Sequence, residues 1–227
     1  MVAATRPRAV TVDVVETLVS LDAVAAVLDG LGVGAHALDR LFTRLLRDGF
    51  ALAASGAYRP FREVADGALA AVAPALTARQ RAEVLTAFSR LDSHPDARPG
   101  LERFHRAGLP VVALTNGAAA TITVVLERAG LDDLVGRVIS IDEVQTWKPS
   151  AAPYRHAADA MGVAPPRLAH VAVHGWDVHG AHRAGLVTGW ASRLEGTFPA
   201  VFDAPDVAGA DLVEVADGLL GLPDDTA

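Results

Sequence analysis

Five polar side chains that could carry out chemistry each follow an apolar run of strand length. In chain order they are Asp13, Thr115, Asn116, Lys148 and Asp177. A carboxylate at a strand end can attack an electrophilic carbon or phosphorus atom and form a covalent intermediate, which divides one difficult displacement into two easier steps. A nearby lysine ammonium would keep that carboxylate ionised, because an opposite charge favours the charged form. Each residue alone could cap a helix, form a turn or lie in solvent, but their shared position favours an active site.

The apolar runs alternate with stretches of helical periodicity, which is typical of an α/β protein with a Rossmann-like parallel sheet covered by helices. Strands are predicted at residues 9–14, 110–115, 137–141, 168–174 and 186–191, with a shorter signal at 211–215. Helices are predicted at 101–107, 118–129 and 151–161, and Gly108 and Gly130 follow two of them. Ligands bind such sheets at the carboxyl ends of the strands, near the point where strand order reverses. The five polar residues are therefore expected to meet at one edge of the sheet.

Residues 21–94 differ from the rest of the chain, because leucines recur there at helical spacing and no strand pattern is present. Pro60 and Pro74 divide this stretch into several helices. A group of helices inserted after the first strand predicts a helical cap at 21–94. The core would then consist of residues 1–20 and 95–227.

The composition excludes several classes of protein. The formal net charge of −7 and the pI near 5.5 argue against a general nucleic-acid binder, which needs a basic face to neutralise phosphates. The absence of cysteine rules out disulfides, thiolate metal sites and a cysteine nucleophile. No apolar run is long enough to span a membrane and no N-terminal targeting signal is evident, so a soluble cytoplasmic protein is expected. A small anionic organic substrate fits an acidic chain, because a local pocket can oppose the overall charge.

Four short motifs in this order resemble those of the haloacid dehalogenase superfamily, over nearly the whole chain. They are Asp13-x-x-x-Thr17-Leu18, Thr115-Asn116-Gly117, Lys148-Pro149 and Asp177. The segments that are similar to the type II, or L-2-haloacid, dehalogenase branch are Ser140-Ile141-x-x-Val144-x-x-x-Lys148-Pro149 and Trp176-Asp177-x-x-Gly180-Ala181. The resemblance implies the fold of that superfamily, a Rossmann-like core with an inserted helical cap. It also makes a homodimer one expected assembly.

The resemblance implies a role for each motif. Asp13 would be the nucleophile, and Lys148 would hold its carboxylate ionised and oriented. Hydroxyl and amide groups for hydrogen bonds to the nucleophile or to a substrate carboxylate would come from Thr17, Thr115 and Asn116. Asp177 would order or deprotonate the water that attacks the ester, assisted by Lys148.

Among the positions that depart from the usual pattern of type II dehalogenases, two are predicted substrate contacts. Val15 stands where that branch usually has an aromatic residue. His174 stands where it has an asparagine, and an imidazole there could donate, accept or act as a base. Trp176 and Trp147 are expected to form walls of the substrate pocket.

The residue that would hold the halide or carboxylate from the cap is also different. Phe42 aligns with the cap arginine of the dehalogenase branch. Three arginines share one helix face near Phe42, namely Arg40, Arg44 and Arg47. The nearest of them lie two residues from Phe42 in the sequence, so Arg44 is a second candidate for substrate binding. The alternative explanation for these arginines is a solvated cap surface.

No metal or other cofactor is expected. Phosphatases of the superfamily carry acidic residues at the positions of Val15 and Val173, which complete a magnesium site or protonate the leaving group. Magnesium binds oxygen ligands, and valine supplies none. His170 and His174 are about 13 Å apart on an extended strand, too far to share an ion.

The resemblance implies that Asp13 displaces the halide of a small (S)-2-haloacid and that water hydrolyses the resulting ester to a 2-hydroxy acid, with inversion at carbon. Three alternatives stay open. The first is hydrolysis of another small activated carboxylate, with a C–X or C–N bond, by the same ester chemistry. The second is a phosphatase with a degraded metal site, and the third is a non-catalytic binding module that kept the fold.

Overall fold

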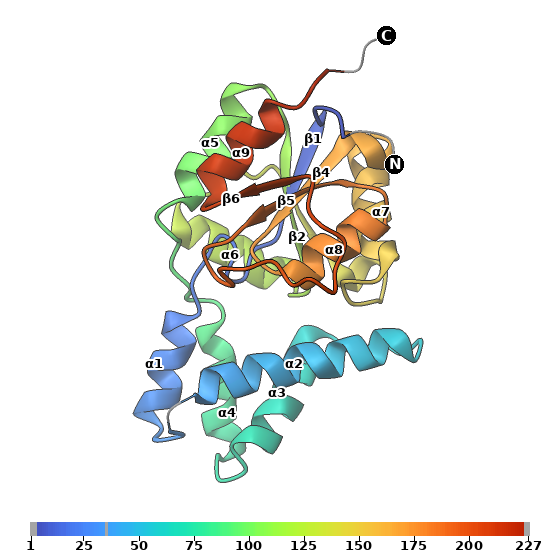
Figure 1. Ribbon diagram of the computed structural model, residues 1–227. Helices are drawn as coiled ribbons and strands as arrows, with labels where there is room; N and C mark the ends of the chain where they lie inside the picture. Colours follow the sequence, from blue (N-terminus) through green and yellow to red (C-terminus); the bar gives the residue numbers. More distant parts are fainter. Residues whose placement is uncertain (1–3, 35, 225–227) are drawn as a thin grey trace.

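The computed structural model describes residues 4–34 and 36–224, and a six-stranded parallel sheet lies at the centre of this part (Figure 1). Its strands are β1 (Ala9–Val12), β2 (Val111–Thr115), β3 (Val138–Ser140), β4 (Leu168–Ala172), β5 (Val187–Ala191) and β6 (Val207–Gly209). The order is β3-β2-β1-β4-β5-β6, so the direction of winding reverses between β1 and β4. The first five strands confirm the predictions from 9–14 to 186–191.

Helices cover both faces of the sheet. One face carries α5 (Ala97–Arg106), α6 (Ala119–Ala129) and α9 (Leu212–Leu220), whose apolar residues belong to the largest hydrophobic cluster. The other face carries α7 (Ala151–Met161) and α8 (Gly175–Arg183), which share a second cluster. Two short 3-10 helices, η1 (Ile141–Glu143) and η2 (Pro165–Arg167), follow β3 and precede β4. The three predicted core helices are confirmed, and Gly130 ends α6 with a φ of 64°.

The strand signal at 211–215 is wrong, because this segment begins a helix. The carboxylate of Asp211 accepts hydrogen bonds from the backbone nitrogens of Val213 and Glu214 and so caps α9. The buried residues of α9 recur at helical spacing, at Leu212, Val215, Ala216 and Leu219. A short β-branched and apolar run does not distinguish a strand from the first turn of a buried helix.

Four helices form the separate lobe at the bottom of Figure 1. They are α1 (Asp22–Gly30), α2 (Ala37–Ala54), α3 (Phe61–Val72) and α4 (Ala78–Ala87). This is the inserted helical cap, and Pro60 and Pro74 flank α3 as predicted. The two segments that join cap and core run side by side, since Val19 and Ser93 form an antiparallel bridge. The division at residues 20 and 95 stays a prediction.

The cap rests on the core at Trp147, a fully buried residue of the loop after η1. Its indole Nε1 donates to the backbone oxygen of Arg59 in the cap at 3.0 Å. A side-chain carbon built on Gly49 of α2 would lie 2.4 Å from the Trp147 ring, so only glycine allows α2 to approach this closely. The Tyr58 hydroxyl donates to Asp142 of the core. Trp147 therefore fastens the cap to the core, and its predicted role as a wall of the substrate pocket is wrong.

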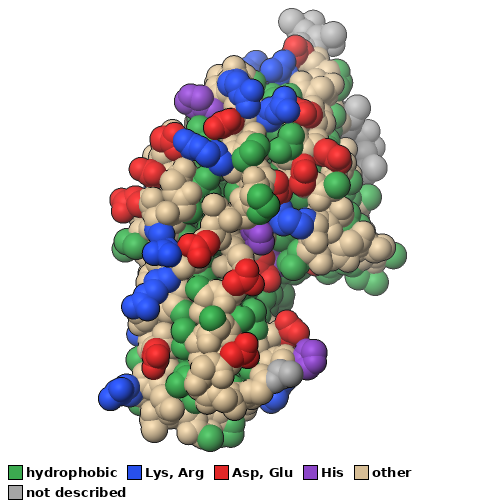
Figure 2. All heavy atoms as spheres, turned by 90° about the vertical axis from the view of Figure 1, so that its left-hand side faces the viewer, with side chains coloured by type: hydrophobic (Ala, Val, Ile, Leu, Met, Phe, Trp, Pro, Cys, Tyr) green, Lys and Arg blue, Asp and Glu red, His purple; other side chains and the backbone are tan. Residues whose placement is uncertain are grey.

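The surface carries charges of both signs. In Figure 2, Lys and Arg side chains lie among Asp and Glu side chains, and an indentation separates the cap from the core on the right-hand side. None of the helices within 4–34 and 36–224 combines the length and the hydrophobicity needed to cross a membrane.

Candidate active site

The loops after four strands bring the sequence-predicted polar residues to one edge of the sheet. Asp13 directly follows β1, and its backbone nitrogen donates to Val171 of β4 at 3.0 Å. Thr115 ends β2, Lys148 follows β3 and η1, and His174 is the N-cap of α8 after β4. These positions surround the point between β1 and β4 where strand order reverses, which is where doubly wound sheets bind ligands.

The ammonium group of Lys148 is the centre of this arrangement. The residue is fully buried, and its Nζ lies 2.9 Å from Asp13 Oδ1 and 2.7 Å from Asp177 Oδ2. The third donor position is used by the backbone oxygen of Leu114, at 2.9 Å. Burial lowers the pKa of Lys148, but the two carboxylates outweigh it and hold the pKa above its ordinary value. Lys148 is therefore charged at neutral pH in the folded protein.

Asp13 is held as a carboxylate by donors on both of its oxygens. Lys148 donates to Oδ1, and the Thr17 hydroxyl donates to Oδ2 at 2.8 Å. His174 Nδ1 lies 3.5 Å from Oδ2, an ion-pair distance without hydrogen-bond alignment. Burial raises the pKa of Asp13, but Lys148 and His174 oppose it and keep the pKa below its ordinary value. Asp13 is thus an oriented, ionised carboxylate.

Asp177 lies behind Lys148 and is fully buried. Besides Lys148, it accepts a hydrogen bond from the Tyr154 hydroxyl at 2.5 Å, and His170 Nε2 lies 3.1 Å from its Oδ2. Burial raises the pKa of Asp177, but Lys148 and His170 lower it far below the ordinary value. A carboxylate held so strongly in its charged form is a weak base, so this geometry suits positioning of Lys148 better than deprotonation of water.

His174 joins Asp13 to a second carboxylate that sequence analysis did not include in the site. Its Nε2 lies 3.0 Å from Glu16 Oε2, and Glu16 adopts a left-handed backbone conformation with a φ of 65°. Burial lowers the pKa of His174, but the neighbouring carboxylates of Asp13 and Glu16 raise it to about 9. Near neutral pH the imidazole is therefore a cation beside the ionised Asp13.

A small pocket of about 20 Å³ lies over Asp13. Its lining includes six predicted substrate contacts, namely Val15, Phe42, Thr115, Asn116, His174 and Trp176, together with Leu46, Phe61 and Gly117. The amide oxygen of Asn116 accepts from the backbone nitrogen of Lys148 at 3.0 Å, which leaves its NH2 group for a ligand. In the part of the chain that the structure describes, the buried Trp176 Nε1 has no hydrogen-bond partner. The pocket thus combines apolar walls with free donors.

Arg44 does not line this pocket, so its prediction as a substrate contact is wrong. It lies with Arg40 and Arg47 along a different groove and pairs with Asp48 at 3.5 Å. Two residues span about 200° of an α-helix, so Phe42 and Arg44 point to nearly opposite sides of α2. Phe42 faces the site, with its ring 5.9 Å from the imidazole of His174.

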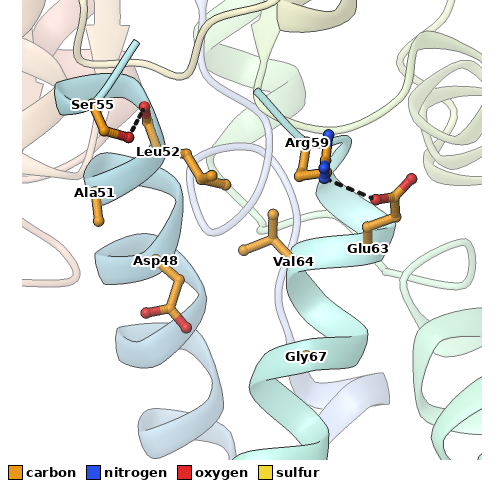
Figure 3. A pocket seen from close by; sticks show the side chains of 8 residues that line it. All are labelled: Asp48, Ala51, Leu52, Ser55, Arg59, Glu63, Val64 and Gly67. Carbon is orange, nitrogen blue, oxygen red and sulfur yellow. Dashed lines mark hydrogen bonds and ion pairs between the residues drawn. The ribbon is translucent and has the colours of Figure 1, made fainter. Parts of the chain in front are cut away.

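A larger groove of about 500 Å³ lies between α2 and α3, away from Asp13 (Figure 3). Figure 3 shows two polar contacts in this groove, the ion pair of Arg59 with Glu63 and the hydrogen bond from the Ser55 hydroxyl to the backbone oxygen of Leu52. The fourth polar residue, Asp48, pairs with arginines of its own helix. None of the strand-end residues lines this groove, so the candidate active site is the pocket at Asp13.

Comparison with known proteins agrees with this geometry. A family model described as haloacid dehalogenase-like hydrolase matches residues 7–185, which include every strand-end residue named above. The chain belongs to this family. Its fold and its class of enzyme, hydrolase, are therefore those of the haloacid dehalogenase-like hydrolases.

Two relatives within the family cover most of the chain. The (S)-2-haloacid dehalogenase 2 of Pseudomonas sp. (strain CBS-3) is 30% identical over 162 residues, which are 69% of this chain and 71% of the relative. The (S)-2-haloacid dehalogenase 4A of Burkholderia cepacia is 30% identical over 189 residues, 80% and 81% of the two chains.

Solved structures extend the similarity to almost the full length. The L-2-haloacid dehalogenase RSc1362 superposes with a TM-score of 0.89 at 28% identity, covering 95% of this chain and 99% of the other. The L-2-haloacid dehalogenase from Xanthobacter autotrophicus with chloropropionic acid covalently bound gives a TM-score of 0.86 at 25% identity, with the same coverage.

Proposed function

We propose that this haloacid dehalogenase-like hydrolase is an (S)-2-haloacid dehalogenase with Asp13 as its nucleophile. The observation that carries the proposal is the ionised Asp13 carboxylate, held by Lys148 and Thr17 at the base of a small pocket with apolar walls. The relatives named above, one of them a structure with chloropropionic acid covalently bound, support the same assignment. The small anionic substrate is part of this proposal.

In the first step, an Asp13 oxygen attacks the carbon that bears the halogen. The new C–O bond makes an aspartyl ester, and the C–X bond breaks with its electron pair leaving on the halide. The NH2 group of Asn116 and the Thr115 hydroxyl are available to the substrate carboxylate. The buried Trp176 N–H and the His174 cation are the donors available to the departing halide, in a pocket where Phe42 contributes no charge. A halide leaves without a proton, so this step needs no general acid.

In the second step, water attacks the carbonyl carbon of the ester, and the 2-hydroxy acid leaves with the oxygen that came from Asp13. We assign the deprotonation of this water to His174, because ester formation removes the charge of Asp13 and with it a major reason for the raised pKa of His174. Burial then favours the neutral imidazole, which can accept the proton. Glu16 orients the ring through Nε2.

The residues around Asp13 do not fit a magnesium ion. Val15 and Val173, at the positions where phosphatases of the superfamily carry acidic residues, have no side-chain oxygen. The Lys148 ammonium lies 2.9 Å from Asp13 Oδ1, where a cation would bind. Among residues 4–34 and 36–224 no group of three or more His, Asp or Glu side chains could hold a metal. We therefore propose chemistry without a metal, and we propose a cytoplasmic location for this cysteine-free protein.

The proposal is tested by a single turnover of racemic 2-bromopropionate with excess protein in water enriched in oxygen-18, in the presence of EDTA. We expect halide release from the S enantiomer only, one heavy oxygen in the peptide that contains Asp13, and a product hydroxyl without label. Direct attack of water on the carbon would instead label the product and leave Asp13 unlabelled, which would overturn the nucleophile. Failure to release halide, together with magnesium-dependent cleavage of a phosphate ester, would overturn the function.

Replacing His174 with glutamine is expected to trap the ester. Glutamine keeps a hydrogen-bonding group but cannot accept a proton, so ester hydrolysis should slow by about 100-fold or more while halide is still released in the first turnover. Intact mass spectrometry should show the protein with one acyl group attached. In the wild type, the hydrolysis step should accelerate as pH rises and His174 of the ester loses its proton, whereas the variant should show no such dependence.

The matched control is His179→Gln, because His179 lies on the same helix α8 and pairs with Asp203 outside the pocket. This variant should hydrolyse the ester at the rate of the wild type. If His174→Gln accumulated no ester and turned over at the wild-type rate, the base would have to be another group, and the role of Asp13 would stand.

A further inference from the structure

A second, larger cavity lies next to the pocket over Asp13, between the cap and the core. Its walls come from α3 and α4 of the cap, from α6 of the core and from the loops after β1 and β2. Its volume is about 110 Å³. The residues that line this side chamber are Val15, Phe61, Arg62, Leu85, Phe88, Gly117, Ala118, Thr121 and Ile122.

The side chamber directly adjoins the catalytic pocket, because the two cavities share part of their lining. Val15, Phe61 and Gly117 line both spaces, so each forms part of the boundary between them. The pocket itself, at about 20 Å³, is much smaller than the side chamber. A substrate attacked by Asp13 therefore finds most of the adjoining free space on the side of Val15. Valine is small, and an aromatic side chain at this position would extend toward that space.

The chemistry of the side chamber is apolar. Leu85, Phe88 and Ile122 are buried and present hydrocarbon surface. Of the described residues that line the chamber, Arg62 alone is charged, and it is exposed, so its charged end can stay in water while its stem covers the wall. Thr121 and the backbone of Gly117 add little polarity. A cavity of this kind is suited to a hydrocarbon group rather than to a second carboxylate.

We propose that the side chamber binds the apolar substituent on the halogen-bearing carbon and selects 2-halocarboxylates whose substituent is longer than methyl. This inference rests on the proposed dehalogenase function. In this arrangement the carboxylate and the C–X bond lie in the pocket over Asp13, and the chain passes between Val15 and Phe61 toward Phe88. Because the chamber takes part only in binding the substituent, its effect falls on the choice of substrate and not on the chemistry of displacement.

The test is a series of kcat/KM values for 2-bromopropionate, 2-bromobutyrate, 2-bromohexanoate and 2-bromooctanoate, measured as halide release. All four present a halide on a similar secondary carbon, so differences report how the substituent is bound. Each buried methylene strengthens binding by about fourfold. We expect 2-bromohexanoate to exceed 2-bromopropionate by at least about 10-fold, with a decline once the chain outgrows the chamber.

A variant that fills the side chamber should reverse this preference. Thr121 lies on α6 and is half-buried, so Thr121→Phe adds a ring at the chamber without disturbing the core beneath it. The ratio of the kcat/KM value for 2-bromohexanoate to that for 2-bromopropionate should fall by about 10-fold. Thr123→Phe is the matched control, because Thr123 lies on the same helix but is exposed and outside the chamber. Its ratio should equal that of the wild type.

The outcomes separate this inference from the proposed function. Halide release from every substrate with 2-bromopropionate the best would overturn the side chamber as a substrate site and leave the dehalogenase assignment intact. An unchanged ratio in a folded Thr121→Phe variant would also overturn it. The wild-type series decides the question even if that variant does not fold. No halide release from any of the four would count against the proposed function itself.

Discussion

Asp13→Asn should abolish multiple turnover, with a loss of at least about 10⁴-fold in kcat, while the protein stays folded. The amide that replaces the carboxylate is a poor nucleophile, yet its oxygen can still accept from Lys148 or Thr17, the two donors that hold Asp13. The measurement is halide release from 2-bromopropionate, with circular dichroism and thermal unfolding to establish that the variant is folded. The expected change in stability is small compared with the change in rate.

Asp22→Asn provides the matched control for this experiment. Asp22 is an exposed aspartate in the first turn of α1, and it takes no part in the pocket. The same chemical change at Asp22 should leave the rate at the wild-type level. A folded Asp13→Asn protein that kept most of its activity would show that Asp13 is not the nucleophile, whatever the substrate.

Lys148→Met should produce the largest loss of stability of any single substitution in the site, about 3–5 kcal/mol in the free energy of unfolding. Methionine approximates the volume of lysine but leaves Asp13 and Asp177 without the ammonium that lies 2.9 and 2.7 Å from their oxygens. Both carboxylates are buried, so two negative charges would remain in a medium that does not solvate them. Urea denaturation at neutral pH measures the effect, and catalysis should be lost as well.

The double variant Lys148→Met/Asp177→Asn tests the cause of this loss. Removal of one of the two unpaired charges should recover part of the lost stability, so the two substitutions should be strongly non-additive. Acidification should also reduce the difference between wild type and Lys148→Met. The native pKa of Asp13 and of Asp177 is lowered in the wild type, so the stability that they contribute is present above the ordinary pKa and fades as pH falls below it. Additive effects of the two substitutions would contradict the buried charge cluster.

The site residues that sequence analysis located correctly are those whose position follows from the local pattern of apolar strand-length runs. Asp13, Thr115 and His174 each end or follow an apolar run, and in a parallel sheet the ends of neighbouring strands lie on the same edge. Lys148 follows the third run after a short loop, which limits how far it can lie from them. Their convergence therefore needed only the correct assignment of the strands.

The roles of residues that contact the site from other helices and strands were not predicted. Tyr154 comes from α7 and His170 from β4, and they meet Asp177 of α8 only because these elements pack on the same face of the sheet. Neither belongs to a motif, and a buried tyrosine or histidine is ordinarily assigned to the core. Glu16 was not included in the predicted site. Its left-handed φ, which accompanies the contact with His174, has no signature in the sequence around it.

The sequence by itself determined the parallel α/β core, the inserted helical cap and a carboxylate–lysine–carboxylate set at one edge of the sheet, because hydrophobic period and strand-end chemistry are local properties. Tertiary structure alone decided which side of α2 faces the site, and so placed Phe42 in the pocket and Arg44 outside it. It also decided that Trp147 fastens the cap and that an apolar chamber adjoins Asp13. These features depend on how a packed helix is rotated and how closely it approaches its neighbours, and Gly49 is needed for the close approach of α2 to Trp147. The helical period of a sequence does not specify this orientation.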